Sequence, residues 1–217
     1  MTETAHLSKQ RLEALTDGIF AIMLTLLVLE IRWPELHRAA PDAEIRAAFR
    51  SVWQPLFAFG VTFLLGSGYW LLHHRALQHV RSVDQRFVWI NLIFLLFVSL
   101  LPFSTAALSH FRIGSGFTKT LYFGHQFIVG LLLLVMWIYL HRTGQLHPDP
   151  ELARLRRRMT FRYCILPLAS LAGFFTSLAA PSWGMNAFGF TLLLGLIIRR
   201  GYEKIAGMQS ATGRIDA

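Results

Sequence analysis

The residues of this chain that could do chemistry stand at the start of its first apolar stretch. Asp17 lies inside that stretch and not beside it, Gly18 follows, and Arg11 precedes Asp17 by six residues. An ionisable group held at membrane depth is costly, so it normally has a partner and a function. From Gly18 to Leu29 the chain carries no charge. The pattern therefore predicts a membrane helix with a functional polar start.

Several residues of the same stretch recur at spacings that place them along one stripe of a helix. They are Gly18, Ile22, Thr25 and Leu29, with Leu26 at the edge. Around a symmetry axis the stripe would form rings of apolar side chains, which can close a pore by dewetting, and a ring of hydroxyls, which can replace part of an ion's water shell. Apolar residues at this spacing are also typical of a helix-packing face, so spacing alone leaves both interpretations open.

The composition identifies the class of protein to which these residues belong. Hydrophobic residues make up 54% of the chain and charged residues 15%, whereas a soluble domain carries about 25% charged residues. The chain is therefore expected to be an integral membrane protein. A single cysteine, Cys164, excludes an internal disulfide. The first apolar run follows a polar start and has no small-residue cleavage site, so we interpret it as a retained helix.

The apolar runs predict an all-α fold of six transmembrane helices in one domain over residues 1–217. Each run has about 20 residues, which is enough to cross a bilayer core. The expected spans are about 14–33, 53–74, 87–106, 121–140, 161–180 and 183–199. Only Pro181 and Ser182 separate the last two runs, which predicts a tight antiparallel hairpin.

The distribution of positive charge predicts the orientation. Of the 21 Lys and Arg residues, 15 fall in segments on the side of the N-terminus. Because cytoplasmic loops are enriched in these residues, both termini are expected in the cytoplasm. The basic run over 154–162 could bind nucleic acid, but a topogenic loop touching anionic lipid explains it better. No nucleic-acid partner is expected.

The start of the chain resembles a known family. The segment from Arg11 to Gly18, Arg-x-x-x-Leu-Thr-Asp-Gly, resembles the Arg-x-x-x-Phe-Ser-Asp-Gly signature that opens the first helix of the transmembrane protein 175 potassium channels. The match continues from Phe20 to Ile31. Residues 73–74 are similar to the end of the family's second helix, and residues 89–91 and 102–105 are similar to its third helix. Two residues differ from the signature, but Leu15 in place of Phe is still apolar and Thr16 in place of Ser still carries a hydroxyl.

The resemblance implies a particular assembly and function. With six helices in place of two such units in tandem, the chain looks like the prokaryotic branch, a homotetramer in the bacterial inner membrane whose first helices line a central potassium pathway. It implies a hydrophobic constriction at Ile22 and a selectivity-related hydroxyl at Thr25 with potassium nearby. Around such an axis the spacing of the stripe adds an apolar ring at Leu29, with Leu26 at its edge. The expected partners are other copies of the chain, lipid and permeant monovalent cations, with no cofactor.

A second set of residues is expected to form a polar network anchoring helix one to helices two and three. These residues share one depth of the membrane, and the resemblance implies a structural or gating role for them: Arg11, Thr16, Asp17, Gly18, His73, His74, Trp89 and Asn91. For the two histidines, anchoring of a helix end at the membrane interface remains an alternative.

Two other functions compete with a channel. A secondary transporter, or a proton-conducting membrane protein, is the alternative. A transporter would favour internal repeats and interrupted helices, but Gly and Pro fall mostly at the ends of the expected spans.

An enzyme is not expected, because Asp17 is the only intramembrane acid. The segment 66–70 faintly resembles the loop of other potassium channels, but it lies in a continuous apolar run and predicts close helix packing.

Overall fold

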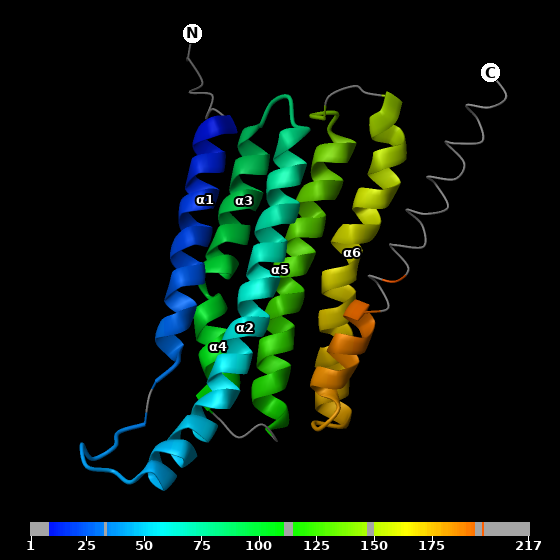
Figure 1. The fold of residues 1–217 in the computed structure, drawn as a ribbon. Coiled ribbons are helices and arrows are strands. Elements are labelled where there is room, and N and C mark those ends of the chain that lie inside the picture. Colours follow the sequence, from blue (N-terminus) through cyan, green and yellow to red (C-terminus); the bar gives the residue numbers. More distant parts are fainter. Residues whose placement is uncertain (1–8, 33, 111–114, 147–149, 194–196, 198–217) are drawn as a thin grey trace, which may run out of the picture.

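The computed structural model describes residues 9–32, 34–110, 115–146, 150–193 and 197, which form a bundle of long helices (Figure 1). In chain order the elements are α1 Lys9–Leu26, the 3-10 turn η1 Leu27–Glu30, α2 Asp42–Gln78, α3 Gln85–Ser99, α4 Leu101–His110, α5 Gly116–Arg142, α6 Pro150–Ala179 and a helix over 184–193. Within the described residues, five helices are long and apolar enough to cross a membrane, with α3 and α4 counted together. The chain is a multi-pass α-helical membrane protein.

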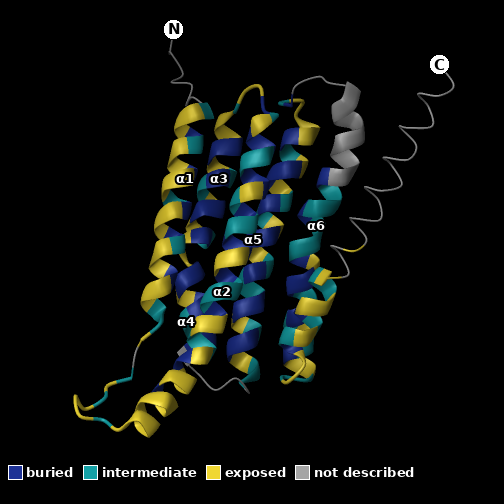
Figure 2. Cartoon of the chain, in the orientation of Figure 1, coloured by how far each residue is buried: buried dark blue, intermediate teal, exposed yellow. Residues whose placement is uncertain are grey.

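The helices are not equivalent in the bundle. α1 lies at one edge and packs on α2 and α3, whereas α5 lies in the middle and contacts α2, α3, α4 and α6 (Figure 1). Figure 2 shows the consequence for burial, since α1 is exposed along much of its length, whereas α5 carries more buried residues. A helix at the edge keeps one face that its own subunit does not cover.

Small residues allow α5 and α6 to pack closely. A Cβ on Gly130 would lie 3.0 Å from Cδ of Pro167, and a Cβ on Gly173 would lie 2.9 Å from the ring of Phe123. Both distances are shorter than an ordinary contact between carbon atoms. Glycine at these two points therefore lets the helices pack along their lengths.

The expected third span is broken into two helices at Leu100. Pro102 is the cause, because it has no N–H to donate to the carbonyl one turn earlier and its ring crowds that carbonyl. Pro55 lies inside α2 and Pro167 inside α6. The expectation that prolines fall mostly at span ends therefore does not hold for Pro55 and Pro167.

Several span boundaries also differ from those expected. α1 ends at Leu26 and passes through η1 into extended chain, so the first span ends before the expected residue 33. α2 begins at Asp42, well before the expected residue 53. Hydropathy marks only the apolar part of a helix and misses a polar first turn. The expected hairpin is present, with a turn after α6 and a helix from residue 184, but residues 194–196, 198 and 199 of the sixth span lie outside the described residues.

At the end of the bundle where α1 begins, a polar joint links the α2–α3 turn to α5. Asp84 caps α3, accepting a hydrogen bond of 2.8 Å from the backbone N–H of Phe87, and it accepts another from the Tyr139 hydroxyl. Burial raises the pKa of Asp84, but the bonds from Tyr139, Phe87 and Gln145 and the charge of Arg86 together hold that pKa below its ordinary value. The charged carboxylate is thus the form that the joint stabilises.

Candidate functional site

The residues predicted to line a pore lie on one exposed face of α1 and of the η1 turn that follows it. We call this face the outer stripe (Gly18, Ile22 and Thr25 in α1 and Leu29 in η1, with Leu26 at its edge). Ile22 is 60% exposed and Leu29 67%, although both are apolar. The opposite face of the same helix is buried in the subunit through Leu12, Phe20 and Met23, each 1% exposed. In a membrane protein, an exposed apolar face meets either lipid or another subunit.

Thr25 is the one hydroxyl in the outer stripe. Its Oγ1 lies 3.0 Å from the carbonyl oxygen of Ala21 and 2.8 Å from that of Ile22, so it donates its proton to its own helix. A hydroxyl whose proton is used in this way still has lone pairs. The Thr25 oxygen can therefore serve as a ligand for a cation beside the helix.

Three of the predicted network residues form a buried chain of hydrogen bonds across three helices. His73 on α2 lies with Nε2 2.7 Å from Oδ1 of Asn91 on α3, and the Nδ2 of Asn91 donates to Oγ1 of Thr16 on α1 at 3.4 Å. The three side chains are at most 2% exposed. Since Oδ1 only accepts, His73 Nε2 carries the proton. The chain holds α1 to α2 and α3 from the face opposite the outer stripe.

Asp17 belongs to a separate contact. Its Oδ1 accepts a hydrogen bond of 2.8 Å from the indole Nε1 of Trp70 on α2. The Trp70 ring stacks on His74 with centroids 5.4 Å apart, and His74 pairs with Gln78 at 3.0 Å. Trp70 was not among the predicted residues. The signal that could have found it is its spacing, because it lies one helical turn before the two histidines.

The remaining predicted network residues are not brought into the buried chain. Trp89 is 60% exposed, because it lies two residues from Asn91 and so about 200° around α3. Gly18 is exposed, with open space where a Cβ would stand. Arg11 is exposed near the start of α1. At this depth the structure shows the Thr16–Asn91–His73 chain and the Asp17–Trp70 pair, and a single network that includes the other residues stays a prediction.

A further polar group in the bundle interior was missed by sequence analysis. Thr62 on α2 bonds to the hydroxyls of Tyr122 on α5 and Thr105 on α4, each at 3.0 Å. Tyr69 donates to the backbone and side-chain carbonyls of Gln126 at 3.0 and 3.1 Å. All five residues are at most 1% exposed. These bonds join the helices behind α1 into a polar interior, away from the outer stripe.

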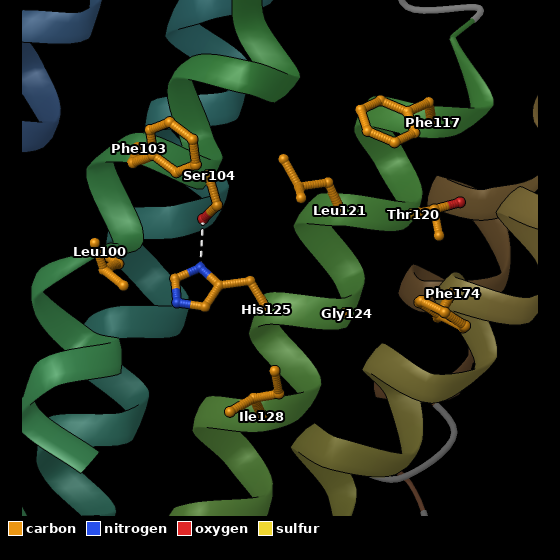
Figure 3. Close-up of a pocket in the computed structure, with 10 residues that line it drawn as sticks. All are labelled: Leu100, Phe103, Ser104, Phe117, Thr120, Leu121, Gly124, His125, Ile128 and Phe174. Atoms are coloured by element: carbon orange, nitrogen blue, oxygen red, sulfur yellow. Dashed lines mark hydrogen bonds between the residues drawn. The ribbon is translucent and has the colours of Figure 1, made fainter. Parts of the chain in front are cut away.

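A groove of about 440 Å³ opens where α3 breaks into α4 and α5 passes (Figure 3). It is lined by Leu100, Phe103, Ser104, Phe117, Thr120, Leu121, Gly124, His125, Ile128 and Phe174. His125 spans the break, with Nδ1 2.7 Å from Oγ of Ser104 and Nε2 2.9 Å from the carbonyl of Phe97. The imidazole therefore supports the bend that Pro102 creates.

These features define a class, that of a multi-pass helical membrane protein that anchors the first helix by one face and leaves the other uncovered. Residues 11–102 match the family described as Endosomal/lysosomal potassium channel TMEM175. A potassium channel of Streptomyces collinus is 31% identical over 153 residues, 69% of this chain and 72% of that protein. The chain belongs to the TMEM175 family, which is a family of ion channels and not of enzymes and has no known cofactor. The recognition made from the signature is confirmed.

Two further relatives and one solved structure are also similar to this chain. A potassium channel of Chamaesiphon minutus is 37% identical over 48% of this chain and 50% of its own length, and the mouse endosomal/lysosomal proton channel TMEM175 is 27% identical over 96% of this chain and 45% of its own. The crystal structure of a lysosomal potassium-selective channel TMEM175 homolog from Chamaesiphon minutus matches with a TM-score of 0.73 and 25% identity, covering 88% of this chain and 97% of that one. The all-helical fold that was predicted is confirmed.

Proposed function

We propose that this chain is a potassium-selective channel that conducts passively through a pore lined by α1. The observation that carries the proposal is the pair of faces on α1. One face is tied into the subunit by the Thr16–Asn91–His73 chain, and the other presents Ile22 and Leu29, 60% and 67% exposed, with the Thr25 oxygen between them. Such a helix is suited to line an axis shared by several copies.

The proposed pore is a homotetramer, in which each residue of the outer stripe becomes a ring of four. Cyclic assembly is the usual way for identical subunits to close around an axis. Rings at Ile22 and Leu29, with Leu26 beside them, would form a constriction that resists wetting. The ring of Thr25 oxygens would replace part of the water shell of a potassium ion at that level.

Within this proposal the polar residues near the start of α1 position the helix and do not select ions. Asp17 lies about 100° around the helix from Gly18 and is held by Trp70 of the same subunit. His73 and Asn91 are buried away from the outer stripe. Their proposed role, and that of Arg11, is in assembly or gating.

The experiment that tests the function is a planar-bilayer recording of purified protein in mixed potassium and sodium. We expect discrete single-channel currents with a reversal potential set by potassium. Saturable flux without single-channel steps would establish a transporter in place of a channel. Because several relatives are named proton channels, the same bilayer is then studied under a pH gradient, and a reversal potential that follows protons would establish proton conduction as the main activity.

Two further parts of the proposal concern assembly and orientation. Native mass spectrometry in detergent should give a tetramer, and a monomer or dimer alone would contradict a shared pore. Of the 21 Lys and Arg residues, 15 fall in segments expected on the side of the N-terminus, so both termini and residues 154–162, in the first turns of α6, are proposed to be cytoplasmic in the bacterial inner membrane. Labelling, from outside intact cells, of cysteines introduced at residues 154–162 would overturn this orientation.

A further inference from the structure

The contact between α1 and α2 is closest at Gly66, behind the outer stripe. A Cβ on Gly66 would lie 3.0 Å from Cε of Met23 and 3.2 Å from Cδ2 of Leu24. An ordinary contact between carbon atoms is about 3.5–4.0 Å. Gly66 is buried in the middle of α2. The missing side chain is thus a notch in α2 into which two side chains of α1 fit.

The notch lies on the side of α1 directly away from the outer stripe. Consecutive residues of a helix are turned by about 100°, so Met23 and Leu24 stand at about 140° and 240° from Gly18. The direction midway between them is opposite the part of the outer stripe formed by Gly18, Ile22 and Thr25, since Ile22 and Thr25 lie within about 40° of Gly18. A side chain added in the notch would therefore push α1 along the line from α2 toward the outer stripe.

We infer that Gly66 is a positioning residue that sets the width of the pore, because the notch determines how far α1 sits back from the axis. The inference rests on the proposed function, and it deepens it by naming a residue that never touches the ion. In a tetramer four helices would move inward together, so a small displacement of each changes the bore at the Ile22 ring from all sides. Passage through an apolar constriction depends steeply on its width.

The reduction in current should increase with the size and stiffness of the side chain added at Gly66. Met23 is unbranched and adaptable, so its thioether end can move aside for the single methyl of Gly66→Ala. Gly66→Val adds a branched side chain that is stiff at χ1 and cannot turn out of the way. We expect the single-channel current to fall slightly in Gly66→Ala and about threefold or more in Gly66→Val.

Two other glycines of α2 provide matched controls. Gly60 and Gly68 have no atom within 4 Å of the position where a Cβ would stand. All three glycines lie inside the same helix, so the intrinsic helix preference of the new residue is nearly the same at each. Gly60→Val and Gly68→Val should therefore keep the wild-type current. Met23→Ala combined with Gly66→Val should restore current, because it removes one of the two side chains that fill the notch.

The experiment measures single-channel current and tetramer mass for each variant in the full-length protein. Reduced current in assembled Gly66→Val, recovered with Met23→Ala, supports the inference; equal currents in Gly66→Val and Gly68→Val overturn it. If Gly66→Val does not assemble, Gly66→Ala decides in the same way against Gly68→Ala. Absence of current from the wild-type protein would contradict the proposed function itself, whereas wild-type current with no difference among the glycine variants contradicts only the role of Gly66.

Discussion

α1 and α5 are both apolar enough to cross a membrane, but they occupy different positions in the protein. In the most apolar part of α1 28% of the residues are buried, against 44% in α5. α5 contacts α2, α3, α4 and α6 of its own subunit, whereas α1 is held by one face only. Hydropathy indicates that a helix enters the bilayer. It does not indicate which helix keeps a face for other copies of the chain.

The largest expected effect is a loss of stability when a buried side chain of α5 is truncated, because α5 packs against more helices of its own subunit than α1 does. Trp137 is 1% exposed, stacks on Tyr163 with centroids 5.0 Å apart and donates to the Thr160 hydroxyl at 2.8 Å. Trp137→Ala should lower the free energy of unfolding by about 3–5 kcal/mol through the cavity it leaves. Reversible unfolding in micelles measures this. The control is Ile138→Ala on the exposed side of the same helix, and an equal loss in both would contradict the central position of α5.

A smaller loss of stability is expected at the buried face of α1. Asn91→Ala removes the partner of His73 and Thr16 and leaves polar groups without water, at a cost of about 1–3 kcal/mol. Asp17→Ala should cost less than about 1 kcal/mol, because Asp17 is exposed and Trp70 is only half-buried. Unfolding and tetramer yield are measured together. If Asp17→Ala were correctly assembled and gated but changed the preference for potassium over sodium, the positioning role would be wrong.

On the outer stripe, the comparison predicts altered current with little loss of stability. Ile22→Ala widens the constriction, so conductance should rise about threefold and discrimination against sodium should weaken. Ile22→Asn should go further, because four amides hold water in the gap. Thr25→Ala should reduce selectivity more than it raises conductance, since ligands are lost while the bore stays nearly the same. Leu24→Ala, on the other face and in the notch at Gly66, should change the current less than Ile22→Ala, and equal currents in the two variants would show that the assigned face is wrong.

The smallest effect concerns the joint between α5 and the α2–α3 turn. The folded protein holds the pKa of Asp84 below the ordinary value of about 3.9. The stabilisation is therefore complete above the unfolded pKa and is lost as pH falls through the lower, folded pKa. Because Asp84 is exposed, the contribution should stay below about 1 kcal/mol. The unfolding free energy is compared in wild type and Asp84→Asn from pH 7 down to about pH 3; a difference that grows on acidification would contradict the direction of the shift.

Much of the fold was predictable because its signals are local. The apolar runs predicted the membrane helices, and the spacing of Ile22, Thr25 and Leu29 predicted that they share a face. The family signature at 11–18 predicted the family. Boundaries were less predictable, because Pro55 stays inside a continuous helix while Pro102 breaks one, and the surroundings of each proline decide between these outcomes.

The polar contacts show where local signals end. The sequence indicated that Asp17 needs a partner, but whether that partner was an arginine, a histidine or Trp70 depended on how α1 and α2 pack. Membrane depth alone grouped Trp89 with Asn91, and only the rotation of α3 separates an exposed indole from a buried amide.

The sequence by itself determined that this is a helical membrane protein of the TMEM175 family with a candidate pore stripe on its first helix, because composition, periodicity and a contiguous motif are properties of neighbouring residues. Only the tertiary structure decided that α1 lies at the edge of the bundle, that the Thr16–Asn91–His73 chain and the Asp17–Trp70 pair hold it there, and that Gly66 forms the notch behind it. The physical reason is that these features depend on which faces of distant helices meet, and packing of whole helices is not encoded in any single segment.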